Sequence, residues 1–208
     1  MKIYILRHGE TALNAKAVMQ GRLDEPMNKN GRDLAAITGK AMKGIHFDCC
    51  ISSSLSRAKE TAEIILRESG NNIPFSIDDR IIEINFGDLE GKKISEMGEE
   101  GYKFYTDPFH FAGFPNGETI QNVCSRTQEF LKELVAKDDG KTYLISTHGC
   151  AMRGMVNDLM DEPANFWYGH APYNCSFTIV EAESGKAQIT DIDKVYYDPS
   201  LIVDHFKR

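Results

Sequence analysis

The stretch Ile5–Asn14, ILRHGETALN, places an arginine and a histidine at the end of an apolar run and follows them with a glycine. A buried strand normally exits into turn residues, and charged groups at such an exit go to water unless something binds them. Arg7 and His8, which can both carry positive charge, are instead typical of a site for an anion. Gly9 lacks a Cβ and lets the backbone approach that anion closely. The stretch therefore predicts a buried strand that ends in a functional edge.

Three segments of the chain share one order, an apolar strand, a short polar turn and then a helical run. The strands are expected at Lys2–Leu6, Phe47–Ile51 and Thr142–Ile145. The helical runs are expected from Thr11, from Leu55 and over about 150–160, and the second has apolar residues at 3–4 spacing. Such βα units are typical of a parallel sheet that helices cover on both faces.

The remaining segments fit the same architecture. Helices are expected after Gly31 and over 120–134, and two β-rich runs around Ser184-Gly185-Lys186 predict a hairpin at the edge of the sheet. We therefore predict an α/β fold, doubly wound, with a mostly parallel sheet and an antiparallel edge hairpin. One domain is expected over 1–208, with a small helical and aromatic cap-like insertion over the site at about 92–117.

Composition excludes several classes of function. The formal net charge of -7 over 208 residues argues against non-specific nucleic-acid binding, which needs a basic surface. The chain begins without a signal-peptide pattern and contains no apolar run of membrane-spanning length, so we expect a cytoplasmic protein with no membrane partner. Five cysteines, an odd number, are expected to be reduced thiols. Neither the cysteines nor the histidines have metal-ligand spacing, so no metal and no cofactor is expected.

Basic groups from three βα units are expected at one edge of the sheet. In a doubly wound sheet, ligands bind beyond the carboxyl ends of the strands. Arg7 and His8 follow the first strand, Arg57 lies on the first helical turn after the second, and His148 follows the third. The sequence does not indicate which strands are neighbours, but it brings these four side chains to the same end.

Phosphoryl transfer is the chemistry that such a set of residues fits. A phosphoryl group in transfer spreads negative charge over three oxygens, and each arginine can bind two of them at once. In the absence of a metal signature, neutral imidazole is a competent nucleophile, and His8 is the candidate. The leaving oxygen then needs a proton from a carboxyl group. Glu83 is the candidate acid, with Asp88, Glu90 and Glu118 nearby in the sequence as alternatives.

Four motifs together resemble the histidine phosphatase superfamily, whose fold is that of the phosphoglycerate mutases. They are RHGETALN at 7–14, SSSLSRAKETA at 52–62, EINFGDLEG at 83–91 and STHGCAMR at 146–153. The resemblance covers nearly the whole chain. It implies that His8 is the phosphorylated nucleophile and Glu83 the proton donor, and that Arg7, Arg57 and His148 complete the phosphate pocket.

The resemblance also implies a set of substrate-binding residues. Leu13 departs from the family pattern, because a tryptophan often stands there. The implied substrate-binding residues are Gly9, Glu10, Thr11, Asn14, Gln20, Gly21, Lys59 and Gly149.

The superfamily contains hydrolases and mutases, and a fold does not choose between them. The mutases that the chain resembles hold a second anionic group with arginines on the insertion and a YGxLQG-like motif, which here reads FGDLEG. Between Arg80 and Arg126 the chain has no arginine and eight acidic residues. We therefore predict a metal-independent phosphomonoester hydrolase for a small phosphorylated metabolite, with a phosphoglycerate mutase or a non-catalytic phosphate-binding protein as alternatives. The aromatic residues of Gly98–Pro115 are expected to form a packed cluster, an apolar lid over the substrate, or both.

Overall fold

The computed structural model describes residues 1–203 and contains one six-stranded sheet. Its strands lie in the order β3-β2-β4-β1-β5-β6. The first four are parallel, whereas β5 and β6 are antiparallel to their neighbours. The strands are β1 (Lys2–Arg7), β2 (Cys49–Ser52), β3 (Phe75–Ile77), β4 (Thr142–Thr147), β5 (Phe177–Glu183) and β6 (Lys186–Lys194). The predicted mostly parallel sheet with an antiparallel edge hairpin is therefore confirmed.

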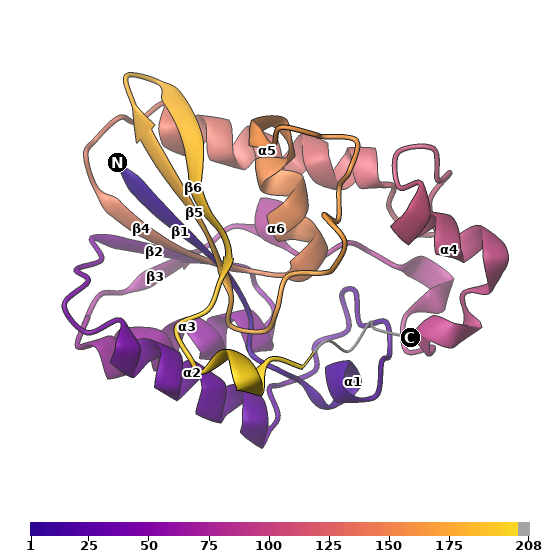
Figure 1. Ribbon diagram of the computed structural model, residues 1–208, viewed down its shortest axis with the longest axis horizontal. Helices are drawn as coiled ribbons and strands as arrows, with labels where there is room; N and C mark the ends of the chain where they lie inside the picture. Colours follow the sequence, from indigo (N-terminus) through magenta and orange to yellow (C-terminus); the bar gives the residue numbers. More distant parts are fainter. Residues whose placement is uncertain (204–208) are drawn as a thin grey trace.

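The helices connect these strands and surround the sheet (Figure 1). The α-helices are α1 (Ala12–Ala15), α2 (Lys29–Ala41), α3 (Ser56–Ser69), α4 (Gly98–Thr106), α5 (Ile120–Val135) and α6 (Gly149–Val156). Short 3₁₀ helices are found at η1 (Asp79–Ile81), η2 (Gly87–Leu89), η3 (Ile94–Glu96), η4 (Asn157–Leu159) and η5 (Pro199–Leu201). Within residues 1–203, no helix combines the length and the apolar character that crossing a bilayer requires.

Helix boundaries follow from local capping. The Thr119 hydroxyl accepts the backbone N–H of Asn122, and the Asn122 side chain accepts the backbone N–H of Thr119. These two hydrogen bonds form a reciprocal cap at the start of α5. Helix α3 ends at Gly70, whose φ of 83° is in the left-handed region that glycine adopts without strain. The helix predicted from Thr11 is only the four residues of α1, capped in the same reciprocal way by Thr11 and Asn14.

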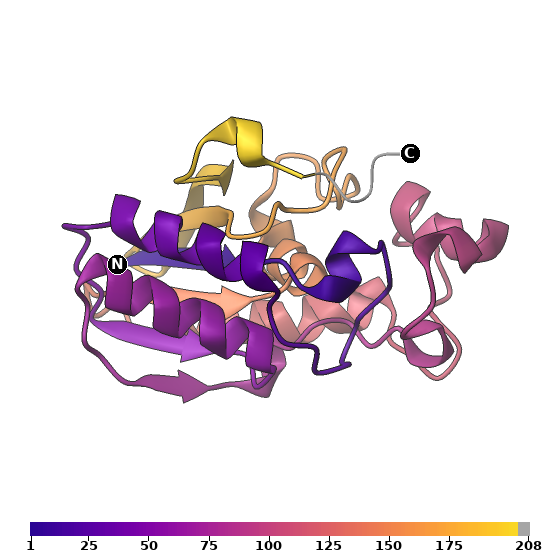
Figure 2. The ribbon, with the colours of Figure 1, turned by 90° about the horizontal axis from the view of Figure 1, so that it is seen from below.

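Two apolar layers, one on each face of the sheet, form the core. On one face, α2 and α3 pack side by side against strand residues such as Leu6 and Phe177 (Figure 2). On the other face, α5 and α6 pack against residues such as Ile3 and Ile5. Because side chains alternate between the two faces of a strand, neighbouring residues of β1 pack into opposite layers. Two covered faces leave the carboxyl ends of the parallel strands as the place for a site.

A third apolar cluster lies beyond that end. It joins the segment around α4 to the loop that follows η4, through residues that include Phe104, Phe114 and Trp167. Phe104 packs edge-to-face on Trp167 with ring centroids 5.1 Å apart, and the Trp167 indole N–H donates to the Phe104 carbonyl oxygen at 2.8 Å. In Figure 1, α4 stands apart from the helices that cover the sheet, on the side toward which β1 runs.

Candidate active site

Adjacent strands bring the two predicted active-site histidines together. In the register of β1 and β4, Arg7 lies opposite Thr147, so His8 and His148 leave neighbouring strands at the same level. Their ring centroids are 5.1 Å apart. Strand β2 lies on the other side of β4, and α3 begins just after it, which places Arg57 at the same edge. The predicted convergence of Arg7, His8, Arg57 and His148 therefore holds in the structure.

His8 is held as a neutral imidazole whose Nε2 carries the lone pair. Its Nδ1 lies 2.7 Å from the carbonyl oxygen of Gly9, which can only accept, so the proton is on Nδ1. Its Nε2 then carries a lone pair and accepts from the Nε of Arg57 at 3.3 Å. Burial, together with the positive charges of Arg57 and Arg7, lowers the pKa of His8 well below 6.5. The ring is therefore neutral at pH 7, as a nucleophile must be.

The two arginines, Arg7 and Arg57, line the same cavity as His8. Arg57 donates to the carbonyl oxygens of Gly21 at 2.8 Å and Leu23 at 2.7 Å, and burial lowers its pKa to about 10, which leaves it cationic at neutral pH. Arg7 donates through Nη1 to the carbonyl oxygen of Pro172, while its buried Nε has no partner among residues 1–203. A buried N–H donor without a partner is costly unless a ligand supplies the acceptor.

His148 lies behind His8 and does not line the cavity. It is fully buried, and its Nε2 lies 2.8 Å from the Ser53 hydroxyl, within hydrogen-bond distance. Its Nδ1 has no partner in the described part of the chain. Burial and the nearby Arg57 lower the pKa of His148 well below 6.5. Ser53 was not among the predicted residues, because the pairing depends on β2 and β4 being neighbours.

Glu83 is the acidic residue that lines the same cavity as His8. Its carboxylate accepts backbone N–H groups at the start of α6, from Ala151 at 3.0 Å and Cys150 at 3.2 Å. The alternative acids have other partners. Glu90 accepts from the backbone of Arg22 and Phe86, Glu118 pairs with Arg126, and Asp88 accepts from the side chain of Asn116. Among the residues that line the cavity, Glu83 is the only acidic one in the described chain.

These side chains line a cavity of about 540 Å³, open mouth included. At one end lie Arg7, His8, Arg57 and Glu83. The remaining wall is largely apolar and comes from loops as well as from α4. Its apolar and aromatic members are Val18, Met19, Phe86, Ile94, Phe104, Tyr105, Trp167 and Ala171. Phe104 thus belongs both to the third apolar cluster and to the cavity wall.

The predicted substrate-binding residues divide into two groups. Asn14, Gln20, Gly21 and Gly149 line the cavity. Gly9, Glu10, Thr11 and Lys59 do not.

The second group has positions of its own in the fold. Glu10 accepts from the side chains of Asn28 and Asn30, at 2.7 and 3.2 Å, which ties the end of β1 to the start of α2. Thr11 caps α1 and donates to the Gln20 side chain at 2.8 Å. A Cβ at position 9 would lie 2.7 Å from the Gly31 carbonyl oxygen, a backbone atom, which explains why glycine stands there. Lys59 lies half-exposed on α3.

Several residues of the site were not predicted from the sequence. Trp167 and Pro172 belong to a loop with no periodicity, and only the folded chain brings them to the cavity and to Arg7. Thr61 sits one turn after Arg57 and accepts the Gly9 N–H at 2.9 Å, which helical spacing could have indicated. In residues 1–203, no group of three or more His, Cys, Asp or Glu side chains is placed to hold a metal ion.

Comparison with known proteins adds an independent line of observation. The sequence model of the histidine phosphatase superfamily, branch 1, matches residues 3–194. The probable phosphoglycerate mutase GpmB of Salmonella arizonae is 30% identical over 189 residues, which cover 89% of this chain and 87% of that protein. YhfR of Bacillus stearothermophilus superposes with a TM-score of 0.85 at 32% identity, over 93% of this chain and 97% of that one.

A mycobacterial glucosyl-3-phosphoglycerate phosphatase, solved in complex with VO3, superposes with a TM-score of 0.78 at 23% identity. The match covers 90% of this chain and 96% of that one. At that identity the likeness shows the fold alone.

Proposed function

The chain belongs to the histidine phosphatase superfamily, and from this premise we propose that it is a metal-independent phosphomonoester hydrolase that acts through a phosphohistidine intermediate on a small phosphorylated metabolite. The observation that carries the proposal is the state of His8. Its Nδ1 is engaged by the Gly9 carbonyl, and its neutral Nε2 faces Arg57.

In the first step, Nε2 of His8 attacks phosphorus and the bond from phosphorus to the ester oxygen breaks. Arg7 and Arg57 neutralise the charge on the phosphoryl oxygens, which is where most of the transition-state stabilisation is expected. Protonated Glu83 gives its proton to the departing oxygen, so the product leaves as a neutral alcohol. A phosphohistidine and a Glu83 carboxylate remain.

In the second step, water attacks the same phosphorus and the bond between phosphorus and Nε2 breaks. The Glu83 carboxylate takes the proton of the water, which restores the acid for the next cycle. The sum is ester plus water to alcohol plus inorganic phosphate. No metal is required, because guanidinium groups supply the positive charge and imidazole supplies the nucleophile.

Hydrolysis is favoured over mutase activity by the distribution of charge in the cavity. A mutase must bind a second anionic group of its substrate. In the described chain, Arg7 and Arg57 are the only arginines or lysines that line the cavity, and both lie at the His8 end. The aromatic wall formed by residues such as Phe86, Tyr105 and Trp167 suits an uncharged or ring-bearing body, such as an α-ribazole or sugar phosphate.

The mutase alternative has one observation in its favour, since GpmB is named a probable phosphoglycerate mutase and is 30% identical to this chain over 189 residues. The deciding experiment measures phosphate release from nucleotides, sugar phosphates, ribazole phosphate and phosphoglycerates in the presence of excess chelator. We expect release from esters with uncharged bodies at a rate that the chelator does not change. Interconversion of 2- and 3-phosphoglycerate that outpaces phosphate release would instead establish the mutase. Loss of activity with chelator would contradict the metal-independent mechanism.

A further inference from the structure

Glu83 lies in a segment that no helix or strand stabilises. Residues 82–86 run in an irregular conformation between η1 and η2. The backbone groups of such a segment need partners from elsewhere in the protein, because buried polar groups without partners are costly. A proton donor also has to be held within hydrogen-bond distance of the atom that it serves. Whatever binds this backbone therefore determines where the Glu83 carboxyl lies.

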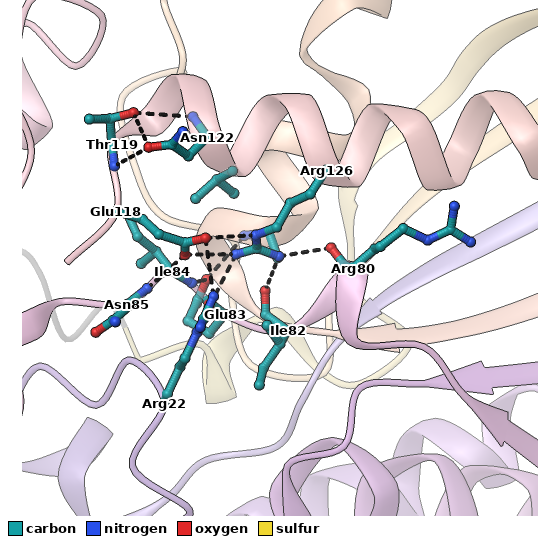
Figure 3. Close-up of polar contacts among 12 residues, drawn as sticks. Arg22, Arg80, Ile82, Glu83, Ile84, Asn85, Glu118, Thr119, Asn122 and Arg126 are labelled. Atoms are coloured by element: carbon teal, nitrogen blue, oxygen red, sulfur yellow. Dashed lines mark hydrogen bonds and ion pairs between the residues drawn. The ribbon is translucent and has the colours of Figure 1, made fainter.

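Arg126, on α5, supplies the donors for carbonyl groups around Glu83 (Figure 3). Its Nη1 donates to the carbonyl oxygens of Arg80 at 2.8 Å and Ile82 at 2.6 Å. Its Nη2 donates to the carbonyl oxygen of Glu83 itself at 3.1 Å. One guanidinium thus satisfies three carbonyl groups within four residues of chain, a task that needs several donors in one plane.

Glu118 fixes the orientation of that guanidinium. Its carboxylate accepts from Nε of Arg126 at 3.1 Å and from Nη2 at 3.2 Å, and it also accepts the backbone N–H of Asn85 at 2.9 Å. All five N–H groups of the Arg126 guanidinium are thereby used, and all point at this segment or at Glu118 (Figure 3). Arg22, from the loop whose carbonyls hold Arg57, reaches the same carboxylate at 3.1 Å.

We propose that Arg126, oriented by Glu118, is a positioning residue that sets the Glu83 carboxyl for proton transfer to the leaving oxygen; the inference rests on the proposed role of Glu83 as the acid. Helix α6 binds the carboxylate of Glu83 through the N–H groups of Cys150 and Ala151, and α5 binds its backbone through Arg126. The acid is therefore fixed from both ends by two helices that pack on each other.

The test compares two esters that both carry an aromatic body, 4-nitrophenyl phosphate and 2-phenylethyl phosphate. The nitrophenolate leaves without help, whereas the alkoxide needs a proton. Arg126→Lys keeps the positive charge but loses the planar set of donors. We expect kcat/KM for the phenylethyl ester to fall by about tenfold or more, since a small displacement of a catalytic group is costly, with little change for the nitrophenyl ester. Arg80→Lys, on the same segment but with its side chain paired on the surface, is the matched control and should change neither.

A double-mutant cycle separates positioning from general damage. In a Glu83→Gln background there is no acid to position, so adding Arg126→Lys should cause no further loss on the phenylethyl ester. Equal losses on both esters in Arg126→Lys, or losses that add to those of Glu83→Gln, would overturn the positioning role and leave the proposed function intact. If Glu83→Gln itself lowered kcat/KM equally for both esters, the acid role of Glu83 would fail, and the positioning role of Arg126 would fail with it. Should Arg126→Lys not fold, Glu118→Gln, which keeps an acceptor for the Asn85 N–H, is expected to show the same ester dependence and decides the matter in its place.

Discussion

At position 8, the backbone and the electrostatics of the site act on one ring. The carbonyl of Gly9 keeps the proton on Nδ1, and burial next to two guanidinium groups keeps a second proton off Nε2. A solvent-exposed histidine at the same point would be partly protonated near neutral pH, and the protonated fraction could not act as a nucleophile. The buried position behind the sheet edge thus keeps the His8 ring neutral, as the proposed role of nucleophile requires.

His8→Ala is expected to abolish turnover, with a fall in kcat of about 10⁴-fold or more, because no other imidazole lines the cavity in the described chain. Covalent labelling of the protein by a ³²P-phosphomonoester should disappear in the same variant. Phosphate release and label incorporation are the two measurements. His46→Ala, at an exposed histidine whose Nε2 lies 3.5 Å from the Asp48 carboxylate, should leave both unchanged. Label that persists in His8→Ala would place the nucleophile elsewhere.

The two buried histidines should make stability depend on pH. Their pKa values in the folded protein lie well below 6.5, whereas in the unfolded chain they return to about that value. Between the folded and unfolded pKa values the unfolded state binds more protons, so the free energy of unfolding falls as the pH drops below about 6.5 and is flat above it. Each histidine contributes a slope of up to about 1.4 kcal/mol per pH unit.

Urea unfolding between about pH 7.5 and 5.5 measures that slope, in a range where most carboxylates stay ionised. His148→Asn should lower the stability at neutral pH but reduce the slope by about half, because one of the two titrating groups is gone. An unchanged slope in the variant would show that the pH dependence comes from other groups.

At the scale of the elements, a hydrogen bond joins the turn that follows β1 to helix α3. The Thr61 hydroxyl accepts the Gly9 N–H at 2.9 Å and donates to the Arg57 carbonyl oxygen at 2.6 Å, so one buried side chain connects the residue after His8 to the helix that carries Arg57. Thr61→Val keeps the shape and removes both bonds. We expect the free energy of unfolding to fall by about 1–3 kcal/mol, the cost of an unsatisfied buried N–H. We also expect kcat to fall severalfold as Gly9 loosens.

Thr38→Val provides the comparison. Thr38 is also fully buried in a helix, on α2, but its hydroxyl has no partner among residues 1–203. Thr38→Val should leave the free energy of unfolding unchanged or raise it, because a buried hydroxyl without a hydrogen bond destabilises the folded protein. Chemical denaturation together with kcat in the two variants checks the pair. Equal effects would mean that the hydrogen bond from Gly9 to Thr61 contributes nothing specific.

Some of these elements and contacts could be predicted from the sequence, and others could not. The polar residues after three apolar runs predicted that Arg7, Arg57 and His148 lie at the same edge of the sheet. This prediction does not depend on strand order, because all parallel strands end at that edge. Strand β3 was not predicted, since Phe75–Ile77 is three residues long, is partly exposed and shows no apolar run. The contact between Ser53 and His148 needed the strand order, which depends on tertiary packing and not on any local pattern.

For the whole molecule, we expect the third apolar cluster to affect both stability and substrate preference. Phe104 is 1% exposed and packs on Phe86, Phe114 and Trp167, yet its ring also forms part of the cavity wall. Phe104→Ala should therefore lower the free energy of unfolding by about 3–5 kcal/mol. It should also reduce the ratio of kcat/KM for a bulky aromatic phosphomonoester to that for a small one, because the apolar contact with the substrate body is lost.

Phe109 allows the two effects to be separated. It packs on the same cluster, with its ring 6.0 Å from that of Phe166, but it does not line the cavity. Phe109→Ala should cost stability and leave the preference for bulky esters unchanged. Denaturant unfolding and kcat/KM for the two esters, measured on both variants, give the answer. A cluster that only supports the fold would show the same preference in both variants, whereas a cluster that also covers the substrate would lose it in Phe104→Ala alone.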